Sequence, residues 1–373
     1  MTPVYLDFNA STPIAAEVTA AMRAVSAEGY GNPSSTHWAA GAAKQSLEAS
    51  RAQVAHLLGC RPLEIVFTSG GSEANNLAIK GMYFARRHTT AHIITSAIEH
   101  PSVLAPSGFL EGLGARITRL PVDSTGRVDP EDLRRAINAD TILISLMHAN
   151  NEVGTLEPIE ECARIARAHG VTFHTDAAQS VGKIATRVDD LGVDLLTLAG
   201  HKLYAPKGVG ALYVRDGIRL ESLIHGGGHE GGRRAGTESA VLAAGLGAAC
   251  ALAQNLEWTR TAQALRDELW NGLRDALGER VVLNGHPELR LPNTLNVSLV
   301  GHIAAEILGA LDGIAASAGS ACHSGRVEIS PVLRAMGVPE RVAAGAIRFS
   351  LGRTSRRAEI RQVIERISGT LNI

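Results

Sequence analysis

Apolar runs that end in clusters of polar residues constrain the fold more than any other feature of this chain. The runs cover residues 64–68, 92–95, 141–147, 171–175 and 193–202. Each is short enough for a buried strand, and helix-like patterns separate them, as in a mostly parallel sheet with helices on both faces. Ligands of such sheets bind in the crevice beyond the carboxyl ends of the strands. The sequence therefore predicts an α/β fold in which the polar residues after these runs converge on one site.

The pattern changes in the second half of the chain. A glycine-rich stretch at residues 225–236 reads either as a loop that closes over a ligand or as an ordinary linker. An alanine-rich helix is expected around residues 239–254, and short strands are expected near residues 293–299 and 346–351. These features predict a second, smaller α+β unit.

The same change of pattern suggests a division into two domains. We expect a large ligand-binding domain at residues 14–254. Residues 1–13 and 255–373 would form the smaller domain, which would carry the segment around Cys322 as well as Arg348.

Composition excludes several classes of partner. The chain has 373 residues, of which 45% are hydrophobic, and its formal net charge is −1 at pH 7. A nearly neutral chain has no long-range attraction for nucleic acid or anionic lipid, and no apolar stretch approaches the ~20 residues of a membrane span. The N-terminal residues lack the pattern of a signal peptide, so we expect a cytoplasmic protein. Its four cysteines form no Cys-x-x-Cys pair, which suggests neither a metal site nor disulfides.

Lys202 and Asp176 are the most informative polar residues at these strand ends. A lysine at the end of a buried strand would be partly desolvated, and the resulting fall in its pKa favours Schiff-base chemistry. Taken alone, Lys202 reads more readily as a surface residue. A carboxylate at a neighbouring strand end changes that reading, because pyridoxal phosphate needs a lysine for its imine and an acid for its ring nitrogen.

The turn at residues 68–76 offers a place for the phosphate of such a cofactor. It runs from a strand through Gly70 and Gly71 to Ser72, which opens a helix whose free backbone N–H groups suit an anion. An ordinary helix cap is the alternative reading. Gln179 is placed to bind the ring hydroxyl, and His100 to stack on the ring or carry protons, although a single histidine is more often a packed or surface residue.

Two further residues suggest how a substrate would be held and attacked. Arg348 alternates with apolar residues on a strand, which suits a bidentate grip on a carboxylate, although a solvated edge arginine is equally consistent. Cys322 lies among small residues in Ser320-Ala321-Cys322-His323, whereas Cys250 lies in an apolar run. An accessible thiol next to a histidine favours a nucleophile over a packed cysteine.

With these residues in place, the chain resembles the cysteine desulfurases of fold-type I, in the class V aminotransferase superfamily. The resemblance runs nearly from end to end. The motifs that carry it are Tyr5-Leu6-Asp7, Gly31-Asn32-Pro33-Ser34-Ser35, the turn at 68–76, Glu99-His100, Asn150-Asn151-Glu152-Val153-Gly154, His174-Thr175-Asp176-Ala177-Ala178-Gln179, Gly200-His201-Lys202, Gly226-Gly227-Gly228-His229-Glu230, Arg234-Ala235-Gly236-Thr237, Ser320-Ala321-Cys322 and Ile347-Arg348-Phe349-Ser350-Leu351.

The resemblance implies a homodimeric pyridoxal 5'-phosphate enzyme that converts L-cysteine to L-alanine. Its sulfur would pass to Cys322 as a persulfide and then to an acceptor, such as an iron–sulfur scaffold or a sulfur relay protein. Lys202 would bind the cofactor covalently, and His100 would take part in catalysis. The resemblance implies cofactor contacts for Gly71, Ser72, Asn151, Asp176, Gln179, His201 and, from the partner subunit, Thr237. It implies substrate contacts for Asn32, Asn151 and Arg348.

Two departures keep alternatives open. Ala199 stands where the housekeeping desulfurases often have a phosphate-binding serine, so one phosphate contact is in question. The segment Ala321-Cys322-His323-Ser324 also resembles selenocysteine lyases, which makes release of selenium from L-selenocysteine the main alternative activity. A class V aminotransferase that leaves Cys322 idle and a non-enzymatic scaffold are less favoured alternatives.

Overall fold

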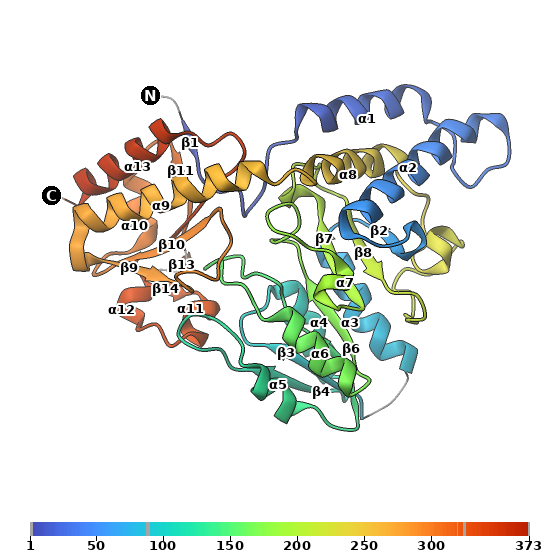
Figure 1. The fold of residues 1–373 in the computed structure, drawn as a ribbon, viewed down its shortest axis with the longest axis horizontal. Coiled ribbons are helices and arrows are strands. Elements are labelled where there is room, and N and C mark those ends of the chain that lie inside the picture. Colours follow the sequence, from blue (N-terminus) through green and yellow to red (C-terminus); the bar gives the residue numbers. More distant parts are fainter. Residues whose placement is uncertain (1–2, 87–89, 319, 324–325, 372–373) are drawn as a thin grey trace.

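A computed structural model describes residues 3–86, 90–318, 320–323 and 326–371, with the backbone alone described at 320–323 and 326–328. The two larger sheets of the described chain lie side by side, each with its own helices (Figure 1). The α/β fold predicted from the sequence is confirmed.

The larger sheet has seven strands in the order β2-β8-β7-β6-β5-β3-β4. Neighbours from β7 to β4 run parallel, and β8 runs antiparallel to both β7 and β2. In chain order the strands are β2 (Ile65–Thr68), β3 (His92–Ser96), β4 (Arg116–Leu120), β5 (Thr141–Ser145), β6 (Thr172–Asp176), β7 (Leu195–Ala199) and β8 (Gly210–Val214).

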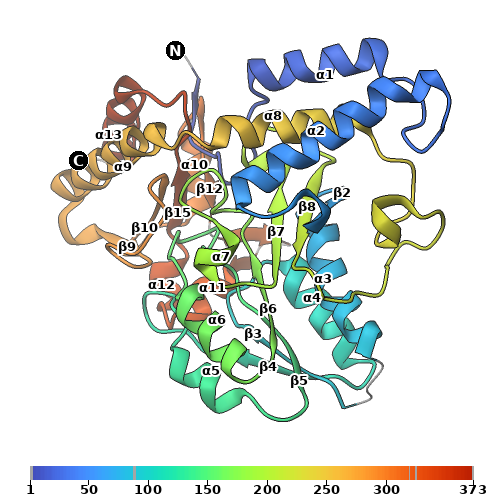
Figure 2. The same ribbon diagram turned by 45° about the vertical axis from the view of Figure 1, so that its right-hand side comes forward.

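Helices bury both faces of this sheet, which explains why most of its strands read as continuous apolar runs, whereas the edge strand β4 is partly exposed. Along β7, Leu195 packs in the cluster with α3 and α4, whereas Leu196 and Leu198 pack on the opposite face with α2, α6 and α8. Figure 2 shows α3 and α4 on one side of the sheet and α6 and α7 on the other. These helices are α1 (Ala16–Glu28), α2 (Gly41–Leu58), α3 (Gly71–Arg86), α4 (Pro101–Glu111), α5 (Pro130–Ala136), α6 (Ile159–Ala168), α7 (Val188–Leu191) and α8 (Ala240–Ala253).

The smaller sheet has four strands in the order β12-β15-β10-β9, paired antiparallel. Its strands are β9 (Val281–Asn284), β10 (Thr294–Leu299), β12 (Ser317–Ala318) and β15 (Ala346–Ser350). Its helices are α9 (Glu257–Leu277), α10 (Ala304–Ala310), α11 (Pro331–Ala335), α12 (Glu340–Ala343) and α13 (Arg357–Thr370). A separate apolar cluster joins α9 and α13 to β10 and β15.

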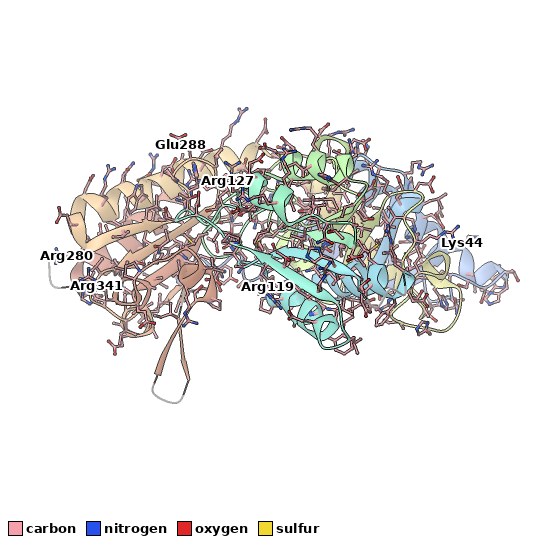
Figure 3. The ribbon with its side chains drawn as sticks, turned by 90° about the horizontal axis from the view of Figure 1, so that it is seen from below. Lys44, Arg119, Arg127, Arg280, Glu288 and Arg341 are labelled. Atoms are coloured by element: carbon pink, nitrogen blue, oxygen red, sulfur yellow. The ribbon has the colours of Figure 1, made fainter. Side chains whose placement is uncertain are left out.

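Two short strand pairs complete the smaller half. β1 (Val4–Tyr5) pairs parallel with β11 (Ile314–Ala315), so the N-terminal segment lies against the C-terminal part of the chain. The hairpin of β13 (Ser320–His323) and β14 (Arg326–Ile329) projects from the body of the molecule (Figure 3). Figure 3 also places Arg280 and Arg341 at the end of the molecule that holds the smaller sheet, and Lys44 at the opposite end.

Among the described residues, no single helix is long and apolar enough to cross a membrane. One pair, Ala240–Ala253 with Glu257–Arg280, meets that criterion only when its two helices are joined across a 74° bend.

Candidate active site

A cavity of about 310 Å³ opens where the carboxyl ends of the central strands meet the N-terminal segment and β15. Many of the residues singled out in the sequence line it. These are Gly71, Ser72, His100, Asn151, Asp176, Gln179, His201, Lys202 and Arg348. The remaining lining residues are Asn9, Ala10, Asn75, Ser102, Met147, Ala149, Ala178 and Ala199.

Lys202 enters the cavity from a 3-10 turn rather than from the strand itself. β7 ends at Ala199, and Gly200–Lys202 form the turn, because the backbone there folds back toward β8. The Lys202 Nζ donates hydrogen bonds to the carbonyl oxygens of Asn9 at 2.5 Å and Ala10 at 2.8 Å. Burial and the Arg348 guanidinium lower the pKa of Lys202 to about 8, against partial opposition from Asp176 and Asp7. A sizeable fraction of unprotonated amine near neutral pH is what imine formation requires.

Asp176 closes β6 and is held by two donors. Its Oδ2 accepts a hydrogen bond from the Asn75 Nδ2 at 2.7 Å, and its Oδ1 accepts one from the Ala178 N–H at 2.9 Å. Asn75 also donates to the Ser102 Oγ at 2.8 Å. The carboxylate is thus buried in the cavity wall and fixed by one donor from α3 and one from the backbone that follows β6.

His100 continues this hydrogen-bonded chain and caps α4. Its Nδ1 accepts from the Ser102 backbone N–H at 3.1 Å and lies 2.7 Å from the Ser102 Oγ. Burial and Lys202 lower the pKa of His100, while Asp176 opposes them, so the imidazole is neutral at pH 7. Because a backbone N–H can only donate, Nδ1 is the acceptor and the ring proton lies on Nε2.

The start of α3 forms a concave wall near Ala199. A Cβ added at Gly71 would lie 3.1 Å from the Ala199 Cβ, so glycine permits this close approach. The first N–H groups of α3 have no partners within the helix, which makes this end suitable for an anion. His201 lies beside it, and burial lowers its pKa to about 4, so it would act as a neutral donor rather than a cation.

Arg348 extends from β15 into the cavity with several donors already engaged. Its Nη2 donates to the Asp7 Oδ1 at 2.7 Å and to the Ser317 Oγ at 2.8 Å, and its Nη1 donates to the Asn151 carbonyl at 2.9 Å. The buried Nε has no hydrogen-bond partner among the described residues. Asp7 therefore neutralises the guanidinium, and a substrate carboxylate would share or displace this contact.

Three expected site residues are not brought to this cavity within the described part of one chain. Asn32 is exposed on the loop before α2, where its Oδ1 accepts from the Ser34 N–H at 2.9 Å. Thr237 lines a different cavity of about 210 Å³, together with Ser69. Cys322 is paired with Val327 in the β13–β14 hairpin, and its side chain lies outside the described structure. Their assigned roles stay predictions.

Several residues that build the site were not assigned by the sequence analysis. Asn9 contacts Lys202 and Gln179, Asn75 and Ser102 connect Asp176 to His100, and Asp7 pairs with Arg348. The position of Asn75 in the site could have been predicted from the sequence, because Asn75 follows Ser72 by three positions and so lies on the same face of α3. No group of three or more His, Cys, Asp or Glu residues in the described ranges is arranged to hold a metal ion.

Comparisons with known proteins identify the family of this chain. The family model described as "Aminotransferase class-V" matches residues 4–363. The chain is 47% identical over 372 residues to "Cysteine desulfurase IscS" of Dictyoglomus turgidum, covering 98% of this chain and 94% of that protein. It is 46% identical over 367 residues to "Cysteine desulfurase IscS" of Methanosarcina thermophila, covering 97% and 90%.

Two solved structures also resemble this chain over nearly its whole length. A "NIFS-LIKE PROTEIN" aligns with a TM-score of 0.93 at 36% identity and covers 99% of both chains. The structure titled "SspA in complex with cysteine" aligns with a TM-score of 0.84 at 39% identity, covering 93% of this chain and 98% of that one. The family resemblance predicted from the sequence is confirmed. This chain belongs to the cysteine desulfurases of the class-V aminotransferase family, whose members depend on pyridoxal phosphate.

Proposed function

We propose that this chain converts L-cysteine to L-alanine, with pyridoxal phosphate bound at Lys202 and the sulfur received by Cys322. The observation that carries the proposal is the convergence of Lys202, Asp176 and Arg348 on one cavity. Amino-acid chemistry on this cofactor needs three different groups. The Lys202 amine, with a pKa of about 8, can form the imine, the fixed Asp176 carboxylate can pair with the ring nitrogen, and the Arg348 guanidinium can bind a substrate carboxylate.

The cavity residues fit pyridoxal phosphate. Lys202 would supply the amine for covalent attachment, and Asp176 would hold a proton on the ring nitrogen. The N-terminus of α3 at Gly71 and Ser72, with neutral His201, would bind the phosphate through N–H donors. Ala199 offers no side-chain hydrogen bond there, so backbone donors carry more of this contact. When bound, the cofactor withdraws the electron pair left at the substrate α-carbon.

The chain's own residues would supply the remaining steps. Arg348 and Asn151 would hold the substrate carboxylate, and Lys202 or His100 would carry protons to and from the substrate carbons. The Cys322 thiolate would attack the substrate sulfur, so that an S–S bond forms while the substrate C–S bond breaks. A proton added at the substrate β-carbon completes L-alanine and leaves a persulfide on Cys322, which balances atoms and electrons.

Several wider features belong to the same proposal. A homodimer would allow Thr237 of one chain to reach the phosphate bound by the other. The persulfide would transfer its outer sulfur to an acceptor in the cytoplasm, such as an iron–sulfur scaffold or relay protein.

Residues 14–254 would form the cofactor-binding domain, and residues 1–13 and 255–373 would form the smaller domain, which carries Cys322. The β13–β14 hairpin, whose first strand includes Cys322, projects from the body of the molecule, which supports its proposed role in delivering sulfur.

The test is alanine release from L-cysteine and from L-selenocysteine, in the presence of a thiol reductant, by wild type and Cys322→Ser. We expect the variant to lose turnover of L-cysteine by at least about 10³-fold, because serine cannot form a persulfide. Cys60→Ser, which removes a thiol outside the cavity, is the control. Efficient turnover of L-selenocysteine alone, unaffected by Cys322→Ser, would instead identify a selenocysteine lyase.

A further inference from the structure

Lys183 is a buried lysine that the reaction above does not use. It follows β6 by seven positions and is 4% exposed. Its Nζ donates to the Gln179 Oε1 at 2.7 Å and to the Asn9 Oδ1 at 3.0 Å. No ion pair between Lys183 and a carboxylate is found among the described residues. Burial, together with the nearby cations Lys202 and Arg348, holds its pKa well below the usual range. Burying an amine costs free energy unless it is hydrogen-bonded, and the side-chain oxygens of Gln179 and Asn9 supply those bonds.

The two hydrogen-bond partners of the Gln179 side chain determine where its amide oxygen and its amide nitrogen lie. The Lys183 Nζ is a donor, so it selects the amide oxygen of Gln179. The Asn9 carbonyl can only accept, and it binds the Gln179 Nε2 at 2.9 Å. Both constraints demand the same orientation of the amide. Gln179 lines the cavity, and the second N–H of its Nε2 has no partner among the described residues.

Asn9 ties this arrangement to Lys202. Its carbonyl accepts from both the Gln179 Nε2 and the Lys202 Nζ, while its side-chain oxygen accepts from Lys183. Its side-chain nitrogen is also engaged, through the Asn151 carbonyl at 3.3 Å and the Thr294 Oγ1 at 2.9 Å. Moving Asn9 would break several buried hydrogen bonds at once, so its carbonyl oxygen stays fixed as the acceptor for the Gln179 Nε2.

We propose that Lys183 is a positioning residue that holds the Gln179 amide so that an N–H, and not the amide oxygen, faces the bound cofactor. This inference rests on the proposed contact between Gln179 and the cofactor ring oxygen. An N–H donor stabilises negative charge on that oxygen, whereas an amide oxygen in its place would repel it. Loss of the donor therefore raises the pH midpoint of the cofactor's visible absorption.

The experiment is a spectroscopic pH titration of the holoprotein for wild type, Lys183→Met, Gln179→Leu and the double variant. We expect Gln179→Leu to raise the midpoint by about one pH unit, the size of one hydrogen bond. Lys183→Met should raise it by about half a unit, because the Asn9 carbonyl then orients the Gln179 amide alone. In the Gln179→Leu background, Lys183→Met should add less than about 0.3 unit, because the amide it orients is gone. Lys183→Gln retains an N–H donor and should stay near the wild-type midpoint.

The outcomes separate the two claims. An equal shift from Lys183→Met in both backgrounds would show that the lysine acts through its charge or through packing, which overturns the inference. So would an unchanged midpoint in Lys183→Met when Gln179→Leu shifts it. No shift in Gln179→Leu would overturn the proposed ring contact itself. Should Lys183→Met yield no folded holoprotein, Lys183→Leu removes the donor with a different apolar side chain and the same comparison applies.

Discussion

Lys202→Ala should abolish alanine formation from L-cysteine and remove the visible absorption band of the enzyme-bound cofactor. The variant lacks the only amine that the described cavity places beside Asp176, since the other lysine nearby, Lys183, is turned toward Gln179 and Asn9. Loss of a covalent catalyst costs on the order of 10³-fold or more in turnover. The measurements are the absorption spectrum of the purified protein with added cofactor and the rate of alanine release.

Lys207→Ala is the matched control, because Lys207 is an exposed lysine five positions further along the same loop. It should keep both the band and the activity. An unchanged visible band in Lys202→Ala would refute the assignment of the covalent lysine, whatever the activity.

Asp176→Ala should reduce turnover far more than Gln179→Ala. Removing one partner of a buried charge pair costs about 3–5 kcal/mol, which is roughly 10²- to 10⁴-fold in rate. Removing a neutral hydrogen bond costs about tenfold or less. Asp176 would be the charged partner of the ring nitrogen, and its two bound donors, Asn75 and the Ala178 N–H, hold it in place for that role.

The comparison is kcat/KM for L-cysteine at saturating cofactor, with thermal melting of both variants to exclude unfolding. Both residues line the same cavity, so general damage to the site would affect the two variants alike. Equal losses in the two variants would contradict the role of Asp176 in making the cofactor ring an electron acceptor.

Five of the seven strands of the larger sheet could be predicted from the sequence, because they are buried on both faces. The partly exposed β4 and the antiparallel β8 were not among the predicted runs. Leu195 and Leu196 point to opposite helical layers, and such double burial leaves a continuous apolar run that ends where polar residues begin. The exact end of β7 could not be predicted. The predicted run included the polar residues up to Lys202, whereas the strand stops at Ala199 and Gly200–Lys202 form a turn. Hydrophobicity reports burial and not the direction of the backbone.

The sequence predicted those site residues whose charge is unusual at the end of a buried apolar strand, namely Lys202 and Asp176. A site residue was not predictable where its role depends on a contact between distant segments. Asn9 carries no motif of its own, and only the folded chain brings it against Gln179 and Lys202. Asp7 likewise meets Arg348 through a contact that spans nearly the whole chain. Spacing along one helix or strand cannot report such contacts.

Sulfur is expected to pass from L-cysteine to Cys322. The most direct test is mass spectrometry of the protein after one turnover of L-cysteine without reductant, followed by peptide mapping. We expect one added sulfur atom on the peptide that contains Cys322 and none on the peptides of Cys60, Cys162 and Cys250. Burial raises the thiol pKa of each of those three and so suppresses their thiolates. Alanine formed with no sulfur on Cys322, or with sulfur on another cysteine in its place, would contradict the role of Cys322 as the sulfur acceptor.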